Sequence, residues 1–213
     1  MTVRRGVRLP LGQLAPYLLD IPDPPAPFDF ASVFGNARLV EMEVGFGKGL
    51  FLLNSALSRP EVNFLGVEIE RKYQLFTATR MAKRGLRNVR LACGDARAVL
   101  RDSIRTDSVQ ELHVYFPDPW WKTRHRKRRL WTPEFAAECA RVLSPGGRLH
   151  AATDVEEYFL IVTGHLASQP RLRPLPPPGE KRPEHDLDFL TNFERKTRQA
   201  GRDVFRSLHQ KTS

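Results

Sequence analysis

The sequence predicts an α/β fold in which helices cover both faces of a mostly parallel sheet. Short apolar stretches rich in valine, leucine and isoleucine alternate with longer stretches of helical periodicity. Several of the apolar stretches end in a glycine-rich turn or an acidic residue, which is typical of parallel strands that lead toward a ligand. We therefore expect the functional residues to lie at the carboxyl ends of the strands.

Five strands are expected before the C-terminal region, and turn or helix signals separate them. They cover residues 39–44, 62–69, 88–93, 109–116 and 148–153. The first ends at the glycine-rich turn 45–49, which leads into a helix that begins at Leu50. Another helix is expected over residues 71–84, between the second and third strands. This alternation predicts parallel pairing, because parallel neighbours need a crossover connection.

Two further helices are predicted from capping signals. Thr132 supplies a capping hydroxyl and a proline follows at the first helical position, so a helix should run from here to about residue 143. Residues 191–194 fit a capping box, and Gly201 can end the helix that follows it. Residues 204–208 then form the expected last strand.

Two proline-rich segments stand apart from this alternation. Residues 1–36 contain six prolines and little periodicity, which predicts an extended arm whose arginines could follow phosphates. A single catalytic domain would then comprise residues 37–213. The second segment, residues 170–183, is expected to form a surface loop within that domain.

The composition is that of one soluble domain, because 41% of the 213 residues are hydrophobic and 27% are charged. Lys and Arg outnumber Asp and Glu by 34 to 24, and this net charge of +10 favours nucleic acid as a partner, with an anionic membrane second. No stretch resembles a signal peptide or a membrane span, so a cytoplasmic protein is expected. Cys93 and Cys139 lack metal-ligand spacing, which predicts free thiols and no metal.

The glycine-rich turn and the next two strand ends form a candidate nucleotide-like site. Gly45 and Gly47 let the backbone turn sharply and approach a ligand, and Glu43 stands two residues before them. An acid at this place suits a ligand with an amino-acid end and a sulfonium better than one with a pyrophosphate. Glu68 can accept both hydroxyls of an adenosine ribose, and Asp95 can reach the adenine amine.

Each of these acids also has a simpler explanation. Asp95 alone would more often cap a helix, and Glu43 alone could be an incidental acid beside a turn. NAD-binding sites share an acid at the place of Glu68. Their joint placement at three consecutive strand ends favours one ligand site.

The most specific segment follows the fourth strand and runs from Tyr115 to Arg129. Prolines on both sides of Asp118 restrict the backbone, so this carboxylate should be held in place, as catalysis requires. Six Lys or Arg residues and no acid lie between Lys122 and Arg129, and a splayed base with its phosphates could bind there. A solvated charge run is the alternative. We expect one of Trp120 and Trp121 to lie in the core.

These segments resemble the signature segments of the bacterial tRNA (guanine-N(7)-)-methyltransferase family. The matching stretches are EVGFGKG from Glu43, GVEI from Gly66, FPDPW from Phe116, the basic residues up to Arg129, and TNFE from Thr191 followed by Gly201. The resemblance implies a Rossmann-like class I methyltransferase fold with seven strands, the last antiparallel, and S-adenosyl-L-methionine as cofactor. It also implies tRNA as partner, with the variable-loop guanine at position 46 as target, no membrane, no obligate protein partner, and a monomer or homodimer.

The resemblance further implies roles for individual residues. The cofactor contacts would be Glu43, Gly45, Gly47, Glu68, Asp95 and Asp118, and Asp118 would also be catalytic. The substrate contacts would be Lys122, Arg124, His125, Asp154, Thr191, Asn192, Phe193 and Glu194. The residues themselves leave simpler roles open, because Asp154 could cap the next helix and residues 191–194 could only cap their own.

The expected chemistry needs no strong base, because guanine N(7) already has a lone pair in the ring plane. Asp118 is expected to orient the guanine and to stabilise the positive charge that moves onto it. Three other functions stay open. They are methylation of an exocyclic amine of adenine or cytosine, an NAD-dependent dehydrogenase, and a catalytically silent RNA-binding module. The G-x-G-x-G spacing with Glu43 argues against the second, and the complete set of acids against the third.

Overall fold

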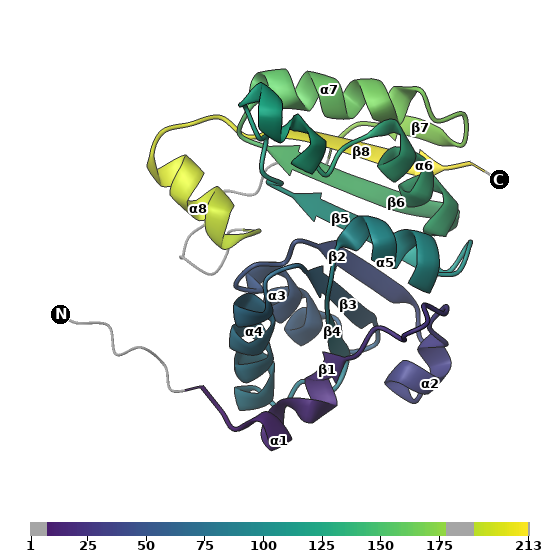
Figure 1. Cartoon of the computed structure of the whole chain (residues 1–213), viewed down its shortest axis with the longest axis vertical. Coiled ribbons are helices and arrows are strands. Elements are labelled where there is room, and N and C mark those ends of the chain that lie inside the picture. Colours follow the sequence, from purple (N-terminus) through teal and green to yellow (C-terminus); the bar gives the residue numbers. More distant parts are fainter. Residues whose placement is uncertain (1–7, 178–189, 213) are drawn as a thin grey trace.

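The computed structural model describes residues 8–177 and 190–212, and these form one eight-stranded sheet with helices on both faces (Figure 1). The strand order is β1-β4-β3-β2-β5-β6-β8-β7. The strands are β1 (Leu18–Leu19), β2 (Val40–Val44), β3 (Asn63–Glu68), β4 (Val89–Cys93), β5 (Val109–Tyr115), β6 (Leu143–Thr153), β7 (Leu172–Leu175) and β8 (Phe205–Lys211). The first six run parallel, whereas β8 is antiparallel to both β6 and β7.

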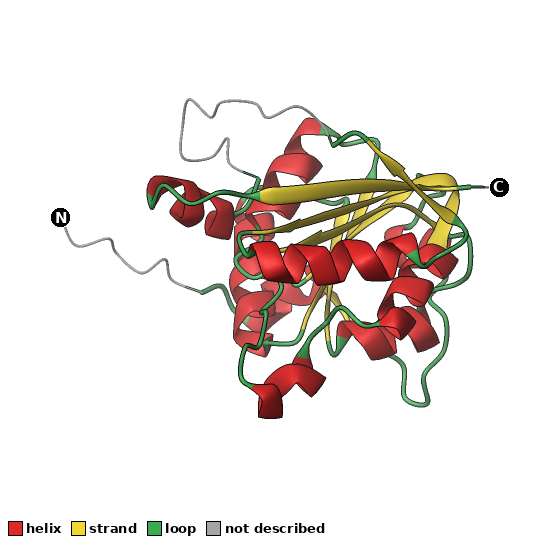
Figure 2. Cartoon of the chain, turned by 90° about the horizontal axis from the view of Figure 1, so that it is seen from above, coloured by secondary structure: helices red, strands yellow, loops and turns green. Residues whose placement is uncertain are grey.

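Two hydrophobic cores lie on opposite faces of the sheet. The helices are α1 (Leu11–Leu14), α2 (Phe30–Phe34), α3 (Leu50–Ser58), α4 (Arg71–Lys83), α5 (Ala96–Ser103), α6 (Pro133–Val142), α7 (Glu156–Ala167) and α8 (Asn192–Gln199), with the 3₁₀ turns η1 (Ala15–Tyr17) and η2 (Thr123–Arg128). Helices α1, α3 and α4 share one core. Helices α2, α5, α6 and α7 share the other, so the central strands are covered on both sides, as Figure 2 shows from above. The predicted α/β class and the helices on both faces are therefore confirmed.

The described N-terminal residues are part of the domain, so the expectation of an extended arm is wrong for residues 8–36. Strand β1 pairs in parallel with β4. Leu14 is fully buried in the α3 and α4 core, and Phe28 and Phe34 are buried in the other. The prolines suggested an open chain, but apolar side chains between them supply the packing. Residues 1–7 lie outside the described residues.

The C-terminal region contains β7, a strand for which no residue range was predicted, and the N-terminal β1 brings the sheet to eight strands instead of the expected seven. Strand β7 lies inside the segment expected to be a loop, and Pro174 is accommodated because β7 is the edge strand of the described sheet. The rest of that segment from residue 178 lies outside the described residues. The antiparallel last strand is confirmed, although it runs to Lys211 rather than ending at residue 208.

The capping signals are confirmed by hydrogen bonds. The Thr132 hydroxyl accepts the backbone N–H of Phe135 at 3.2 Å and starts α6. The Thr191 hydroxyl accepts the backbone N–H of Glu194 at 3.0 Å and starts α8. Gly201, at φ +68°, follows the end of α8. Among the described residues no helix has the length and apolar character needed to cross a membrane.

Candidate active site

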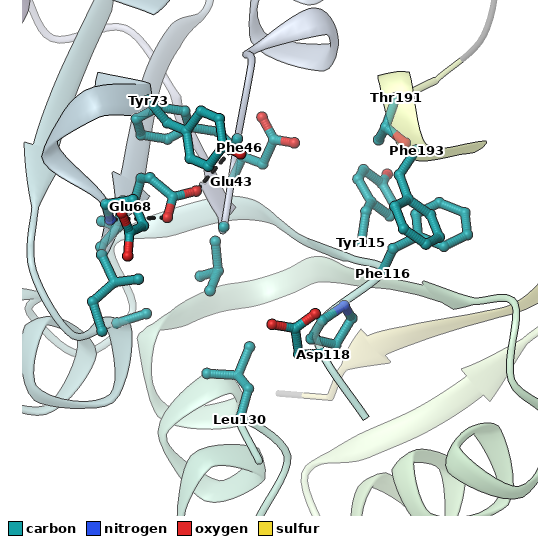
Figure 3. A pocket seen from close by; sticks show the side chains of 18 of the residues that line it. Glu43, Phe46, Glu68, Tyr73, Tyr115, Phe116, Asp118, Leu130, Thr191 and Phe193 are labelled. Atoms are coloured by element: carbon teal, nitrogen blue, oxygen red, sulfur yellow. Dashed lines mark hydrogen bonds between the residues drawn. The ribbon is translucent and has the colours of Figure 1, made fainter. Parts of the chain in front are cut away.

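A cavity of about 1010 Å³ opens at the carboxyl ends of β2, β3, β4 and β5, beside α8. Figure 3 shows Glu43 and Glu68 on one side of it, beside Phe46 and Tyr73, and Asp118 on the other side with Tyr115, Phe116 and Phe193. The predicted site residues that line the cavity are Glu43, Gly45, Gly47, Glu68, Asp95, Asp118, Thr191, Asn192 and Phe193. The other five, Lys122, Arg124, His125, Asp154 and Glu194, do not line it. The structure thus brings all the predicted cofactor contacts together and divides the predicted substrate contacts.

The glycine-rich turn between β2 and α3 is held closed by Glu68 at the end of β3. The backbone N–H of Gly47 donates to Oε2 of Glu68 at 2.9 Å, and the backbone N–H of Glu70 donates to Oε1 at 3.1 Å. Gly49 has φ +64°, and a Cβ built on it would come within 2.3 Å of Thr77 Cγ2. Because α4 passes so close, only glycine fits at this position, and the turn is fixed in shape before any ligand arrives.

Glu43 is a buried carboxylate without a full set of partners. It is the last residue but one of β2 and lines the cavity, and it is only 3% exposed. None of the described residues makes a hydrogen bond with its Oε2 atom. Burial, and secondarily the nearby charge of Glu68, raise the pKa of Glu43 to about 8. A cation or a hydrogen-bond donor placed in the cavity would relieve both penalties, so this carboxylate is suited to a positively charged ligand.

Asp95 caps α5 and also lines the cavity. Its Oδ1 accepts the backbone N–H of Arg97 at 2.9 Å, which confirms the capping interpretation. The Arg97 guanidinium donates to both carboxylate oxygens, and this contact lowers the pKa of Asp95. The carboxylate is therefore charged and oriented at the cavity wall. Capping does not exclude a ligand contact, because each oxygen can accept more than one hydrogen bond.

Asp118 lies in the loop after β5, exposed at the cavity wall. The residues on either side of its Pro-Asp-Pro unit adopt positive φ angles, +52° at Phe116 and +43° at Trp120. Such angles are costly for bulky residues and persist only where the surroundings impose them. The Arg129 guanidinium donates to the Pro119 carbonyl at 2.7 Å, and this hydrogen bond restrains the loop. The expectation of a held carboxylate is consistent with this geometry.

The tryptophans after Asp118 are not core residues. Trp120 is half-buried and lines the cavity, and Trp121 is 51% exposed, so the expectation that one of them lies in the core is wrong. The buried tryptophan is Trp131, which packs against Phe135 of α6. The centres of the Phe116 ring and the Phe193 ring of α8 lie 5.0 Å apart, and the rings are tilted by 36° to each other. Aromatic rings thus form part of the cavity wall.

The basic run forms the turn η2 at the cavity rim. Lys127 and Arg128 line the cavity, and the Arg128 guanidinium lies 5.1 Å from the centre of the Trp120 ring. Lys122 and Arg124 are exposed beside it, and His125 meets the edge of Trp120. The run is therefore a cationic rim and not a charged surface remote from the cavity.

Asp154 and Glu194 hold α8 in place instead of lining the cavity. Asp154 accepts a hydrogen bond from Arg202 at 2.6 Å, which ties the end of β6 to the chain after α8. Glu194 is 4% exposed, and its Oε1 accepts from Arg198 and from Arg206 of β8. The helix α7 starts at Glu156 with Val155 as its N-cap, so the interpretation of Asp154 as that cap is wrong.

Sequence reasoning missed several lining residues, of which the clearest are Tyr73, Tyr115, Arg195 and Lys196. Their positions in the sequence, next to predicted strand ends or in a predicted helix, could have identified them. Tyr115 is the last residue of β5, and Arg195 and Lys196 continue the helix that the capping box begins. Tyr73 comes from the first turn of α4, next to a strand end that was recognised.

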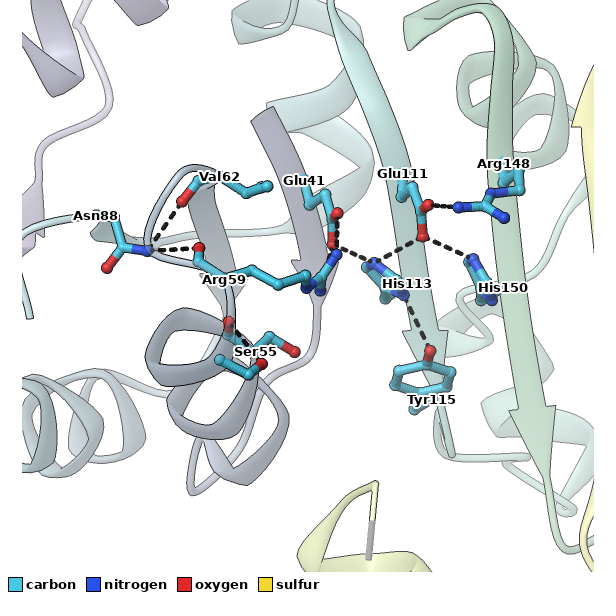
Figure 4. Close-up of polar contacts among 11 residues, drawn as sticks. Glu41, Ser55, Arg59, Val62, Asn88, Glu111, His113, Tyr115, Arg148 and His150 are labelled. Carbon is cyan, nitrogen blue, oxygen red and sulfur yellow. Dashed lines mark hydrogen bonds and ion pairs between the residues drawn. The ribbon is translucent and has the colours of Figure 1, made fainter. Parts of the chain in front are cut away.

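A polar cluster lies under the central strands, on the same face as Tyr115 (Figure 4). The His113 ring forms one hydrogen bond through Nε2 with Glu41, at 3.2 Å, and another through Nδ1 with the Tyr115 hydroxyl, at 2.9 Å. Burial lowers the pKa of His113 to about 4, so the ring is neutral near pH 7. Glu111 bonds to His150 and Arg148.

This cluster is an ion-pair network and not a convincing metal site. Glu111, His113 and His150 offer ligand atoms within 4.8 Å of one another. However, Arg59 already pairs with Glu41, and Arg148 with Glu111, so both carboxylates are neutralised without a metal ion.

Three comparisons place this geometry among known proteins. The family described as "Putative methyltransferase" matches residues 37–207. The tRNA (guanine-N(7)-)-methyltransferase of Rhodopirellula baltica is 43% identical over 90% of this chain and 73% of its own length. The protein of the same name from Bordetella pertussis is 40% identical over 87% and 72%. A solved 16S rRNA (adenine(1408)-N(1))-methyltransferase from Catenulisporales acidiphilia, with S-adenosylmethionine as cosubstrate, has a TM-score of 0.58 at 18% identity, covering 89% of this chain and 94% of that one, and shares the fold.

Proposed function

The chain belongs to the tRNA (guanine-N(7)-)-methyltransferase family, and from this membership we propose that it acts on the variable-loop guanine at tRNA position 46, with Asp118 as catalytic residue. The chain is an enzyme that transfers a methyl group from S-adenosylmethionine to N(7) of guanine in tRNA. The observation that carries the residue assignments is the convergence of Glu43, Glu68 and Asp118 on one cavity.

The residues of the cavity fit S-adenosylmethionine, which when bound supplies an electrophilic methyl group on a sulfonium. The test is Glu43, whose buried Oε2 atom has no partner among the described residues and would gain one from the cationic part of the cofactor. Glu68 already accepts two backbone N–H groups, yet its oxygens retain lone pairs for the ribose hydroxyls. Asp95 would accept the adenine amine while it caps α5. Gly45 and Gly47 would let the backbone approach.

Asp118 would act on the guanine without removing a proton. N(7) attacks with a lone pair that is already in the ring plane, so the protein has to align the base with the methyl group. Methylation leaves the purine positively charged, and a carboxylate at the cavity wall stabilises that charge as it develops. The loop geometry around Asp118 supports this role, because a group held in place needs no reorganisation during the reaction.

The rim would hold the tRNA around the target base. Lys122, Arg124 and His125, together with Lys127 and Arg128, would contact phosphates, and Thr191, Asn192 and Phe193 would contact the nucleotide from α8. The rings of Phe116 and Phe193 offer aromatic surface for an unstacked purine. Asp154 and Glu194 would serve the substrate through α8, which they anchor.

The direct experiment is transfer of labelled methyl groups into unmodified tRNA, followed by digestion to nucleosides and mapping of the modified position. The expected product is 7-methylguanosine at position 46. Methyladenosine or methylcytidine would instead show a methylase of exocyclic amines. Methylation of another guanine would overturn only the position.

Asp118→Ala tests the catalytic assignment. Because the carboxylate is expected to stabilise charge in the transition state, kcat should fall by about 100-fold or more, while the Kd of S-adenosylmethionine changes far less. Glu61→Ala, which removes an exposed acid at the opposite end of β3, is the matched control. Equal losses in kcat and cofactor affinity would show that Asp118 is mainly a binding residue.

A further inference from the structure

Helix α4 and the turn after it carry a cationic surface that the predicted substrate site does not include. Residues 71–94 contain seven Lys or Arg and no Asp or Glu. They are Arg71, Lys72, Arg80, Lys83, Arg84, Arg87 and Arg90. All but Arg80 and Arg90 are exposed, and those two are half-buried. The charge is sparser than in the basic run, where residues 122–129 contain six Lys or Arg, but both segments lack acids.

Part of this charge lies along one face of the helix. Lys72, Phe76, Arg80 and Arg84 follow one another at four-residue intervals, which places them in one row, with Lys83 beside its end. We call these five residues the α4 stripe. With a rise of 1.5 Å per residue, the stripe is about 18 Å long. Phe76 is 45% exposed within it, so the row combines cations with an accessible aromatic ring.

The α4 stripe is continuous with the rim of the cavity. The Arg80 guanidinium donates to the carbonyl of Lys48, and Lys48 itself lines the cavity. Tyr73, in the first turn of α4, lines it as well. Figure 1 shows α4 and α8 on the same side of the molecule. A polyanion whose base occupies the cavity would therefore meet the stripe on leaving the rim.

Helix stability accounts for Arg80 and Lys83, which lie in the last turn of α4, but not for all of the charges. Cations in the last turn interact favourably with the helix dipole, but Arg71 and Lys72 lie in the first turn, where acids are favoured. The first turn contains no acid. Arg80 and Arg84 repel each other, and this repulsion adds to burial in lowering the pKa of Arg80. Lys72 pairs with Glu70 at 3.0 Å, whereas the repulsion between Arg80 and Arg84 is a penalty that a polyanion beside them would relieve.

We propose that the α4 stripe binds the sugar-phosphate backbone of the same tRNA whose guanine occupies the cavity. The proposal rests on the proposed function, since it assumes a tRNA substrate. Charge complementarity selects RNA as the occupant, because phosphates neutralise the cations and the exposed ring can lie against a sugar or a base. The surface contributes affinity and orientation, and it takes no part in the chemical step.

The test is the double variant Lys83→Gln/Arg84→Gln, since glutamine has a helix propensity close to that of lysine and arginine. We expect the KM for tRNA to rise by about tenfold, and the log–log salt dependence of tRNA binding to flatten by about 1.4 to 1.8 for two lost phosphate contacts. The kcat at saturating tRNA and the Kd of S-adenosylmethionine should stay within about twofold, because neither residue lines the cavity.

The matched control is Arg171→Gln/Arg173→Gln at β7, which removes the same charge at the opposite edge of the described sheet. An equal loss in this control would overturn the stripe and show a general charge effect. An unchanged KM and salt slope in the α4 variant, with wild-type enzyme methylating tRNA, would also overturn the stripe alone. A wild-type chain that makes no 7-methylguanosine in tRNA would overturn the proposed function, and the stripe with it.

Discussion

Glu41 and Glu43 are two residues apart on β2, point to the same face and are equally buried at 3% exposure, yet their surroundings are opposite. Glu41 accepts two hydrogen bonds from Arg59 and faces His113. Glu43 has an oxygen, Oε2, with which no described residue makes a hydrogen bond. The two carboxylates therefore differ in their hydrogen-bond and ion-pair partners and not in their burial.

The difference separates structure from function along one strand. A buried charge that is paired contributes to the fold, whereas one that lacks partners lowers stability unless a ligand completes it. Glu41 therefore belongs to the framework, and we propose that Glu43 belongs to the S-adenosylmethionine site. The following predictions test this division, beginning with the largest expected effect.

Replacement of Glu41 should cost stability. Glu41→Gln keeps the shape but removes the charge that balances Arg59, so the free energy of unfolding should fall by about 3 kcal/mol, the lower end for a broken buried pair because Arg59 is partly exposed. Urea denaturation without ligand at pH 7.5 measures this. Glu43→Gln is the control on the same strand, and it should be at least as stable as the wild type. Similar losses in both variants would refute the division.

Replacement of Glu43 should cost cofactor affinity instead. Glu43→Gln removes the charge that S-adenosylmethionine completes, so its Kd should rise by about 10- to 100-fold, in keeping with 1.5–3 kcal/mol for a charge-assisted hydrogen bond. Isothermal titration calorimetry gives the value. Glu41→Gln should bind within about twofold of the wild type, provided that it is assayed where it is folded. A wild-type Kd for Glu43→Gln would remove Glu43 from the site.

The pH dependence of stability should differ between the same two proteins. The folded Glu43 keeps its proton up to about pH 8, whereas an unfolded glutamate loses it near 4.5. The ionisation of buried Glu43 therefore lowers the free energy of unfolding progressively between about pH 4.5 and 8. It has no effect below this range and a constant effect above it. Between pH 6 and 8 the wild type should lose about 2 kcal/mol relative to Glu43→Gln, at 1.36 kcal/mol per unit. Parallel stability curves for the two proteins would contradict a raised pKa.

The sequence indicated Glu43 as a candidate ligand contact but gave no indication of the structural role of Glu41. Glu43 was recognisable because it stands beside a glycine turn at a strand end, and the same local signal identified Glu68 and Asp95. Glu41 looks no different in sequence. Its partners Arg59 and His113 lie 18 and 72 residues away, and only the parallel pairing of β2 with β5 brings His113 to it.

The wrong expectations have related physical causes. The N-terminal prolines suggested an extended arm, but Leu14 and Phe34 find apolar surface on a domain that the local sequence does not reveal. The substrate roles that the resemblance gives to Asp154 and Glu194 are not among the wrong expectations and stay predictions. The structure pairs Asp154 with Arg202, which is distant in sequence, and Glu194 with Arg206, which lies on β8. Tertiary partners decide whether an acid is available to a ligand, and a motif does not list them.

The smallest predicted effect concerns the outer end of the polar cluster. Arg148 pairs with Glu111 but is 47% exposed, and Glu111 also bonds to His150. Because water can replace an exposed partner, Arg148→Gln should lower the free energy of unfolding by less than about 1 kcal/mol. Arg59→Gln is the matched variant and should lose more, since Glu41 is deeper and depends on that arginine for both oxygens. Urea denaturation of both variants ranks them. Equal losses would mean that the burial of the carboxylate does not affect the stability that its arginine partner provides. The missing partner would then be the only difference between Glu43 and Glu41 that matters for stability.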